Sequence, residues 1–312
     1  MNLSDKISNP LEVEFYEEEN KIMGNYDFDS AVIGGGSAGY ATARTTAAAG
    51  KRTVIIEAGG ELGGLCILRG CMPTKALLHA ADVRHQARRS SIWGLKPGEV
   101  SFDFVEVMRR KAAMVEEFAS YRRGQLQDDR FELIRALASF RDPHTLELDN
   151  GKAVTAEHIM ISTGSRVAEL PQPSLAKLSC ITSDDALRLE SLPQSIIVLG
   201  GGAVAVEFAQ FFARFDVEVT LLQRSPHILK AFDDDGAGEV ETAFCAEGIT
   251  VHTGCSLIDA QHDDNDKVIV YERDGVQHEV RAEAVFHGLG RSPNTGSLAL
   301  ENGGVETERG RI

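Results

Sequence analysis

Two segments of the chain repeat one order of apolar and small residues. In the first, the run SAVI at 30–33 meets three glycines, a small-residue segment follows from Ser37 to about Ala49, and the run TVII at 53–56 ends at Glu57. Short apolar runs bounded by glycine predict buried strands, and the longer segment between them predicts a helix. This segment is therefore predicted to form a strand, a glycine turn, a helix and a second strand.

The second copy lies at 195–223, with the sequence SIIVLGGGAVAVEFAQFFARFDVEVTLLQ. Its turn contains Gly200, Gly202 and Ala205, and its second strand run, VTLL, ends at Gln223. Gly200 and Gln223 are 23 positions apart, as are the first glycine and the final acid of the first copy. The matched spacing predicts two βαβ units of the same kind.

The residues of the first turn suit a dinucleotide. Gly34 permits the tight turn, Gly36 lets a pyrophosphate approach the backbone, and Gly39 lets helix and strand pack closely. The helix start, at Ser37, directs free N–H groups at the phosphates, and Glu57 can bind both hydroxyls of a ribose. Two such units predict two dinucleotides, or one dinucleotide and a decayed copy. Two dinucleotides in one enzyme are typically a flavin and a nicotinamide that exchange electrons.

The remaining segments predict further helices and strands. An acidic lead-in covers 1–26, and the region 76–166 carries helical patterns followed by short strands with a turn at DNGK, 149–152. We expect the apolar residues Phe104, Met108, Val115 and Phe118 to form a stripe that faces the core. The last segment, from 284, predicts a strand, a Gly/Pro/Asn turn and a loop-rich tail.

Composition places the chain among ordinary globular proteins. It has 312 residues, 43% of them hydrophobic, and a formal net charge of -15. The length predicts about two domains, and the acidic balance argues against nucleic acid or an anionic membrane as partner. No apolar run is long enough to span a bilayer, and the N-terminus lacks the pattern of a signal peptide, which predicts a cytoplasmic protein. Cys180, Cys245 and Cys255 lie singly and are expected to be buried thiols.

The other two cysteines, Cys66 and Cys71, lie together in GGLCILRGCMPTK at 63–75. A structural zinc site usually has four ligands in two close pairs. Here four residues separate the cysteines, no second pair is near, and His79 and His85 would complete only an irregular set. Metal binding is therefore disfavoured, and no metal ligand is predicted. A pair of unlinked packed thiols stays open at this point.

A redox pair requires an irregular backbone between the cysteines. In a regular helix, residues five apart differ by about 7.5 Å in rise and about 140° in direction, whereas a disulfide needs Cα atoms within about 7 Å. Gly70 supplies the irregularity, and Pro73 suits the first turn of a following helix. Cys71 would then lie at a helix N-terminus, where the helix dipole and Lys75 favour a thiolate.

These motifs resemble the class I pyridine nucleotide–disulfide oxidoreductases, which include dihydrolipoamide dehydrogenase, mercuric reductase and glutathione reductase. The family stretch G-G-x-C-x-x-x-G-C-x-P-x-K matches Gly63, Gly64, Cys66, Gly70, Cys71, Pro73 and Lys75. The resemblance also covers ISTGS at 161–165, GGGAVAVEFAQ at 200–210 and GLGRSPNT at 288–295, and it extends from about residue 27 to the end.

The resemblance implies roles for these residues. Cys66 is similar to the thiol that meets the substrate, and Cys71 to the thiol that forms a charge-transfer complex with the flavin. Lys75 resembles the lysine near flavin N5, with Glu207 as its ion-pair partner. The implied path leads from NAD(P)H through FAD and the Cys66–Cys71 disulfide to the substrate, or the reverse. The implied cofactor-binding residues are Gly34, Gly36, Ser37, Gly39, Glu57, Gly64, Lys75, Thr163, Gly164, Gly200, Gly202, Ala205, Glu207, Gln223, Arg224, Gly290 and Arg291.

The sequence also departs from the family pattern. Leu65, Leu68 and Arg69 replace the commoner residues around the cysteines, and Ala203 replaces a tyrosine that gates the nicotinamide pocket in some members. Family members continue with a second FAD motif and a dimerisation domain bearing a His–Glu acid–base pair. The sequence predicts that this chain, a fragment or a natural short form, retains FAD less well and turns over dithiols slowly.

The end of the second βαβ unit bears on the choice of nicotinamide. An acid there would bind the 2′-hydroxyl of NAD, whereas a positive group accommodates the phosphate of NADP. This chain has Gln223 followed by Arg224, which favours NADPH over NADH. The alternative is that Arg224 is a solvated surface residue.

The sequence as a whole predicts an α/β fold with two dinucleotide-binding domains and no C-terminal dimerisation domain. The predicted divisions are an N-terminal extension at 1–26, an FAD domain at 27–167, an inserted NAD(P) domain at 168–288 and a return segment at 289–312. The predicted partners are a small-molecule disulfide, dithiol, metal ion or quinone, and the full-length family implies a homodimer. Two alternatives stay open, namely a flavin diaphorase that does not use the disulfide and a non-catalytic dinucleotide-binding chain.

Overall fold

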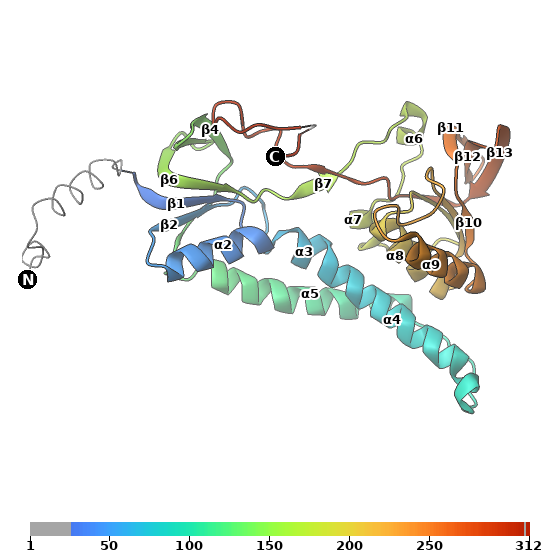
Figure 1. The fold of residues 1–312 in the computed structure, drawn as a ribbon. Coiled ribbons are helices and arrows are strands. Elements are labelled where there is room, and N and C mark those ends of the chain that lie inside the picture. The colour runs from blue at the N-terminus through green and yellow to red at the C-terminus, as the bar shows by residue number, and fades with distance from the viewer. Residues whose placement is uncertain (1–25, 309) are drawn as a thin grey trace, which may run out of the picture. The chain divides into compact units, whose positions relative to one another are not determined.

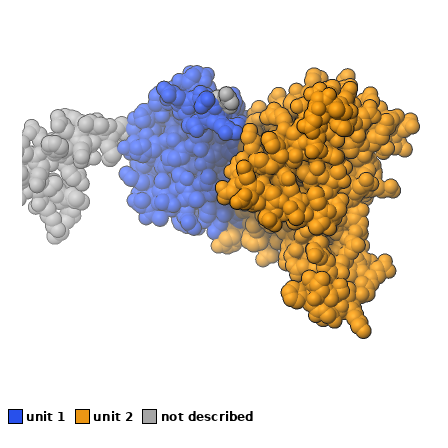
Figure 2. All heavy atoms as spheres, turned by 45° about the vertical axis from the view of Figure 1, so that its right-hand side comes forward, with its two compact units in different colours: residues 1–64, 122–164, 293–312 blue, residues 65–121, 165–292 orange. Residues whose placement is uncertain are grey.

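A computed structural model describes residues 26–308 and 310–312. The predicted N-terminal extension lies almost wholly outside the described residues. The chain divides into two compact units, which Figure 2 colours separately. The first unit contains 1–64, 122–164 and 293–312, and the second contains 65–121 and 165–292.

The first unit is built on a six-stranded mixed sheet (Figure 1). Strand β1 pairs in parallel with β2 and β6, and β2 pairs in parallel with β3, while β4, β5 and β6 are joined antiparallel. The turn predicted at 149–152 connects the hairpin of β5 and β6. The strands are β1 (Phe28–Ile33), β2 (Thr53–Ile56), β3 (Glu132–Ile134), β4 (Ala138–Asp142), β5 (Thr145–Leu148) and β6 (Ala153–Ile161).

Helix α2 (Ser37–Ala48) lies between β1 and β2 in the chain, as the sequence predicts. Its Tyr40 and Ala43 pack against Val32 and Ile55 on one face of the sheet. The alternate positions of the same strands pack into a separate cluster on the other face. Both faces of these parallel strands are therefore covered, which explains why their sequences read as continuous apolar runs.

The second unit repeats this arrangement in a four-stranded parallel sheet of order β10-β9-β8-β14. Helix α8 (Ala203–Arg214) follows β8 and buries Phe208, Phe211 and Phe212 in the core of this unit. The strands are β8 (Ser195–Leu199), β9 (Glu218–Leu222), β10 (Thr250–His252) and β14 (Ala284–His287), and α9 (Asp234–Ala246) precedes β10.

Shorter elements complete the second unit. Strands β11 (Ser256–Asp263), β12 (Asp266–Arg273) and β13 (Val276–Ala282) form an antiparallel sheet. Strand β7 (Ser165–Val167) pairs with β15 (Arg291–Pro293), which brings two segments far apart in sequence together. Two one-turn helices, α6 (Pro173–Ala176) and α7 (Ser183–Ala186), lie before β8.

The region between β2 and β3 is helical, and one feature of it differs from the prediction. Phe104 and Met108 pack in the core of the second unit, but Phe118 is 43% exposed and Ala119 is buried instead. Phe118 lies about 100° around the helix from Ala119, so the apolar stripe turns away from it. The elements are α3 (Gly64–Arg69), α4 (Cys71–Arg89), the 3-10 helix η2 (Ser90–Trp93) and α5 (Phe104–Leu126).

The observed fold is α/β with two glycine-turn βαβ units, as predicted. By contacts, residues 65–121 group with the second unit, whereas the predicted FAD domain includes them. The predicted FAD domain groups residues by the cofactor that they are expected to bind, and its boundaries stay a prediction. Among the described residues, no helix is both long and apolar enough to cross a membrane.

Candidate functional site

The glycine turn after β1 leaves no room for side chains. Gly34 has φ +103°, and a Cβ added to it would overlap the carbonyl oxygen of Ser162. A Cβ on Gly39 would overlap the carbonyl oxygen of Gly34 and lie 2.9 Å from its carbon. Gly36, at the N-cap of α2, has no side chain to satisfy the first-turn N–H groups. The turn therefore fits the pyrophosphate of a dinucleotide.

Two further predicted residues close around this turn. Glu57 follows β2, and its carboxylate accepts hydrogen bonds from the backbone N–H of Gly35, at 2.6 Å, and of Gly59, at 2.7 Å. Gly64 has φ +73°, and a Cβ on it would overlap Cα of Gly36. The carboxylate is thus fixed at the end of β2, where a ribose would bind.

The second unit contains an equivalent turn after β8. Gly200 also has φ +103°, and a Cβ on it would lie 2.5 Å from the carbonyl oxygen of Gly288. The third position is Ala205, which is fully buried, and its Cβ occupies the space that a Cβ on Gly288 would need, at 2.7 Å. The methyl group of Ala205 is therefore accommodated by a glycine on the neighbouring segment.

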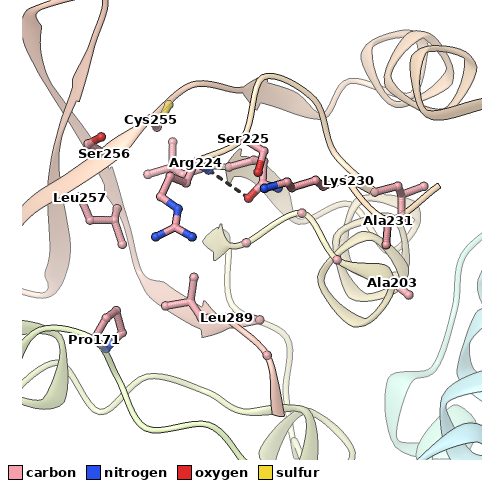
Figure 3. Close-up of a pocket in the computed structure, with 18 of the residues that line it drawn as sticks. Pro171, Ala203, Arg224, Ser225, Lys230, Ala231, Cys255, Ser256, Leu257 and Leu289 are labelled. Carbon is pink, nitrogen blue, oxygen red and sulfur yellow. Dashed lines mark hydrogen bonds between the residues drawn. The ribbon is translucent and has the colours of Figure 1, made fainter. Parts of the chain in front are cut away.

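A cavity of about 640 Å³ opens in front of this second turn (Figure 3). Gly200 and Gly202 line it, together with Gln223 and Arg224 at the end of β9. Gln223 accepts a hydrogen bond from the backbone N–H of Arg224 at 2.9 Å, so its amide oxygen is engaged within the chain. Figure 3 shows the guanidinium of Arg224 extending into the cavity, and Lys230 also lines it.

The predicted cofactor-binding residues Thr163, Gly164, Gly290 and Arg291 lie in or beside the paired strands β7 and β15. Within the first unit, the backbone N–H of Asn294 donates to the carbonyl oxygen of Gly164 at 3.0 Å, and the side-chain amide of Asn294 donates to the carbonyl oxygen of Thr163 at 3.5 Å. Within the second unit, Arg291 donates to the hydroxyl and carbonyl oxygens of Ser165 at 2.9 and 2.8 Å. Gly290, at φ +115°, precedes Arg291.

The cysteine pair lies across a break between two helices. Cys66 belongs to α3 and Cys71 begins α4, and Gly70 separates them with φ -134° and ψ -119°. A Cβ on Gly70 would lie 2.9 Å from the carbonyl oxygen of Leu65 and 3.2 Å from Cα of Cys66. A glycine here therefore lets the second helix start directly against the last turn of the first.

The pKa of Cys71 is shifted in the direction opposite to the prediction. Both cysteines are free thiols, and the pKa of Cys71 is raised, first by its hydrogen bond to Cys66 and then by burial and by the charge of Cys66. The backbone at the helix start and Lys75 act in the predicted direction, but they are weaker. The pKa is raised because a hydrogen bond to Cys66 stabilises the neutral thiol of Cys71.

Lys75 and Glu207 form an ion pair between α4 and α8. One heptad further along both helices, Asp82 pairs with Arg214 at 3.2 Å, so the order of charges is reversed. The partners in both pairs are 132 positions apart, which shows that the two helices run in parallel with a constant register. If one helix slipped by one heptad, like charges of the two pairs would meet. The two ion pairs therefore favour the register that places Lys75 opposite Glu207.

The same register continues at Arg84, a buried residue of α4. Arg84, 8% exposed, donates to the carbonyl oxygen of Arg214 and to the carboxylate of Asp216. The hydrogen bond from Arg84 to this carboxylate, and then the one from Arg88, lower the pKa of Asp216. The aromatic ring of Phe102 lies 4.6 Å from the guanidinium carbon of Arg84. A buried, paired arginine thus anchors α4 to the end of α8.

The remaining cysteines and acidic residues form no further centre. Within residues 26–308 and 310–312, no group of three His, Cys, Asp or Glu side chains is arranged to hold a metal ion. Cys255 is buried and Cys180 is half-buried, but Cys245 is exposed on α9, contrary to the expectation of three buried thiols. Cys245 fails the expectation because the apolar side of this helix, with Ala237 and Phe244, faces the core.

Two residues at the cavity were not predicted from the sequence. Lys230 lies in the loop after β9, six positions beyond Arg224, where a second basic residue was the only available signal. The sequence indicates Gly288 only as part of the motif GLGRSPNT. A glycine is required there because Ala205, far away in the chain, occupies the space of a side chain. No sequence period connects such positions.

Comparison with known proteins agrees with this geometry. The family model for pyridine nucleotide-disulphide oxidoreductases matches residues 28–312. Dihydrolipoyl dehydrogenase of Geobacillus stearothermophilus is 32% identical over 297 residues, covering 93% of this chain and 63% of that protein. Mercuric reductase of Bacillus cereus is 33% identical over 291 residues, covering 93% and 46%.

A solved structure is similar as well. The HOCl-induced flavoprotein disulfide reductase RclA from Escherichia coli superposes with a TM-score of 0.76 at 29% identity, covering 90% of this chain and 60% of that one. The chain thus spans less than two thirds of the length of these relatives. With its two glycine turns and its cysteine pair, this chain belongs to the class I pyridine nucleotide-disulphide oxidoreductases.

Proposed function

We propose that this chain transfers electrons between NAD(P)H and a small-molecule disulfide, dithiol or metal ion, through FAD and the pair Cys66 and Cys71. The observation that carries the proposal is the break at Gly70, which starts α4 at Cys71 directly after the helix that contains Cys66. The relatives support the substrate class by name, since they include dihydrolipoyl dehydrogenase, mercuric reductase and a flavoprotein disulfide reductase.

In this proposal each group of residues has a separate role in binding the cofactor or in electron transfer. Bound FAD would supply the chemistry that accepts a hydride and passes on electron pairs. The turn at Gly34 and the carboxylate of Glu57 would hold its pyrophosphate and ribose. Cys66 would meet the substrate, and Cys71 would hold or release a proton as the pair opens and closes. Glu207 keeps the ammonium of Lys75 in place through their ion pair.

A visible spectrum followed by anaerobic titration with NADPH tests this proposal. We expect a bound flavin and, on reduction, a long-wavelength charge-transfer band that disappears in Cys71→Ser. Flavin reduction without the band would support a diaphorase that bypasses the cysteines. A colourless protein that cannot be reconstituted with FAD would contradict the proposal and support a non-catalytic binding chain.

The finer part of the proposal is a preference for NADPH. Arg224 follows Gln223 at the end of β9, and both Arg224 and Lys230 line the cavity (Figure 3). Two positive side chains and no acid at this strand end suit a 2′-phosphate better than a free 2′-hydroxyl. The backbone bond from Arg224 to Gln223 turns the amide of Gln223 towards the chain, which leaves the cations to meet the phosphate.

Arg224→Ala is expected to raise the KM for NADPH about tenfold, because a charge-assisted hydrogen bond to the phosphate would be lost. The KM for NADH should stay nearly unchanged, since its ribose lacks that phosphate. Steady-state assays with both nucleotides measure the split. Arg281→Ala serves as the control, because Arg281 is an ion-paired residue of β13 that does not line the cavity. Equal effects of Arg224→Ala on both nucleotides would refute the preference.

A further inference from the structure

His287 is a buried imidazole for which the proposed electron path has no use. It is the last residue of β14 and is 5% exposed. Its Nε2 lies 2.8 Å from the carbonyl oxygen of Ala168, and its Nδ1 lies 3.3 Å from the backbone nitrogen of Leu289. Because a carbonyl can only accept and an amide N–H can only donate, both bonds require the neutral ring with its proton on Nε2.

Both backbone partners of this ring belong to walls of the nucleotide cavity. After Ala168, the chain contributes Glu169, Pro171 and Gln172 to the lining. Leu289 is itself a lining residue, between Gly288 and Gly290. Figure 3 shows Pro171 and Leu289 on the side of the cavity opposite the backbone of Arg224. The imidazole therefore ties together two walls that are more than a hundred positions apart in the chain.

The imidazole is one of several ties that hold the wall around Leu289. Gly288 and Gly290 flank it, and Gly290 has φ +115°, so the segment is intrinsically permissive. The opposite end of the segment is fixed, because Gly288 lies against Gly200 and Ala205 in the glycine turn. A backbone bond from Ala168 to Gly290, at 3.1 Å, also joins the two walls. Losing the imidazole should thus loosen the cavity without unfolding the unit.

We propose that His287 is a positioning residue for the nicotinamide nucleotide, holding the walls at 168–172 and 288–290 at the separation that the dinucleotide needs. The inference rests on the proposed function, because it assumes that this cavity binds NAD(P)H. It assigns His287 no contact with the nucleotide and no role in choosing between NADPH and NADH. Substitutions should therefore weaken both nucleotides alike, unlike Arg224→Ala.

Three variants separate the two hydrogen bonds. Asparagine can place an amide oxygen near the position of Nδ1 and keep the bond from Leu289, whereas glutamine can place an amide nitrogen near Nε2 and keep the bond to Ala168. His287→Leu removes both. We expect affinity to fall about tenfold in His287→Leu and about threefold in His287→Asn and in His287→Gln, for NADPH and NADH alike.

Isothermal titration calorimetry of the full chain with each nucleotide measures these affinities, and thermal unfolding is followed in parallel. His262→Leu is the control for the loss of a bond from histidine to a backbone carbonyl, since the exposed His262 bonds that of Lys177 at 3.2 Å, away from the cavity lining. Its affinities should equal those of the wild type. If His287→Leu does not fold, the asparagine and glutamine variants still decide the question.

Three results would overturn the inference. Wild-type affinity in the asparagine and glutamine variants would show that losing either bond leaves nucleotide binding unchanged, contrary to the inference. Equal losses in all three variants would show that the hydrogen bonds are not the cause. A wild-type chain that binds neither nucleotide would overturn the inference and the proposed function together, whereas the first two results would leave the proposed function intact.

Discussion

Gly39→Ala is expected to lower the free energy of unfolding by about 3 kcal/mol and to abolish retention of FAD. The new Cβ would overlap the carbonyl oxygen of Gly34 and lie 3.3 Å from a methyl carbon of Val32. The obstacle is backbone on one side and a buried strand residue on the other, so neither can move aside cheaply. Relief would require α2 to move away from β1, which opens the pyrophosphate turn.

The sign of the change in the free energy of unfolding distinguishes close packing at Gly39 from an ordinary helix position. In an exposed helix, replacing glycine by alanine normally stabilises by about 0.5–1 kcal/mol. Gly124→Ala in α5 is the matched control, because no atom lies within 4 Å of the Cβ it would add. Chemical denaturation of both variants, with the flavin content of each, measures the difference. A Gly39→Ala protein as stable as Gly124→Ala would contradict the close packing described for this turn.

Local signals explain the part of the fold that the sequence predicts well. The runs at 53–56 and 219–222 are apolar, β-branched or leucine-rich and bounded by turn residues, and each forms the predicted strand. The helix after the first turn begins at Ser37, as predicted, because glycines before it and small residues within it suit only that geometry. The break at Gly70 was also predictable, since a regular helix cannot bring Cys66 and Cys71 together.

Features that depend on tertiary contacts were not predictable in this way. Helical spacing placed Phe118 in the core, but the packed stripe follows Ala119, a residue too small to stand out in an apolar pattern. Helix position and Lys75 suggested a lowered pKa for Cys71, but the nearest acceptor, Cys66, reverses the direction. The side-chain bonds of His287 join backbone atoms at 168 and 289, and no local pattern signals them.

The two βαβ units share the packing of their first turn glycine but differ at the third turn residue. In both, the first glycine of the turn approaches a carbonyl oxygen on a neighbouring segment, that of Ser162 in the first unit and of Gly288 in the second. The third turn residue is Gly39 in the first unit and Ala205 in the second. In the second unit the methyl group of Ala205 faces Gly288 on the neighbouring segment, which predicts that a side chain cannot be added at Gly288.

Gly288→Ala tests this compensation, and we expect it to lower the free energy of unfolding by about 3 kcal/mol. Its Cβ would lie 2.7 Å from the Cβ of Ala205 and 2.9 Å from the carbonyl oxygen of Leu199. Affinity for NADPH should fall with it, because Gly288 lines the nucleotide cavity. Gly296→Ala, where no atom lies within 4 Å of the added Cβ, should leave the free energy of unfolding nearly unchanged.

A double-mutant cycle with Ala205→Gly isolates the contact between the two methyl groups. Ala205→Gly alone should cost about 1 kcal/mol, since it adds a glycine to α8. In the double variant it should instead recover about 1–2 kcal/mol, because the clash between the two Cβ atoms is removed while the one with Leu199 remains. Urea denaturation of the four proteins gives the coupling energy. Additive effects would show that Gly288 is required by the backbone of Leu199 alone, and that Ala205 is not what the glycine accommodates.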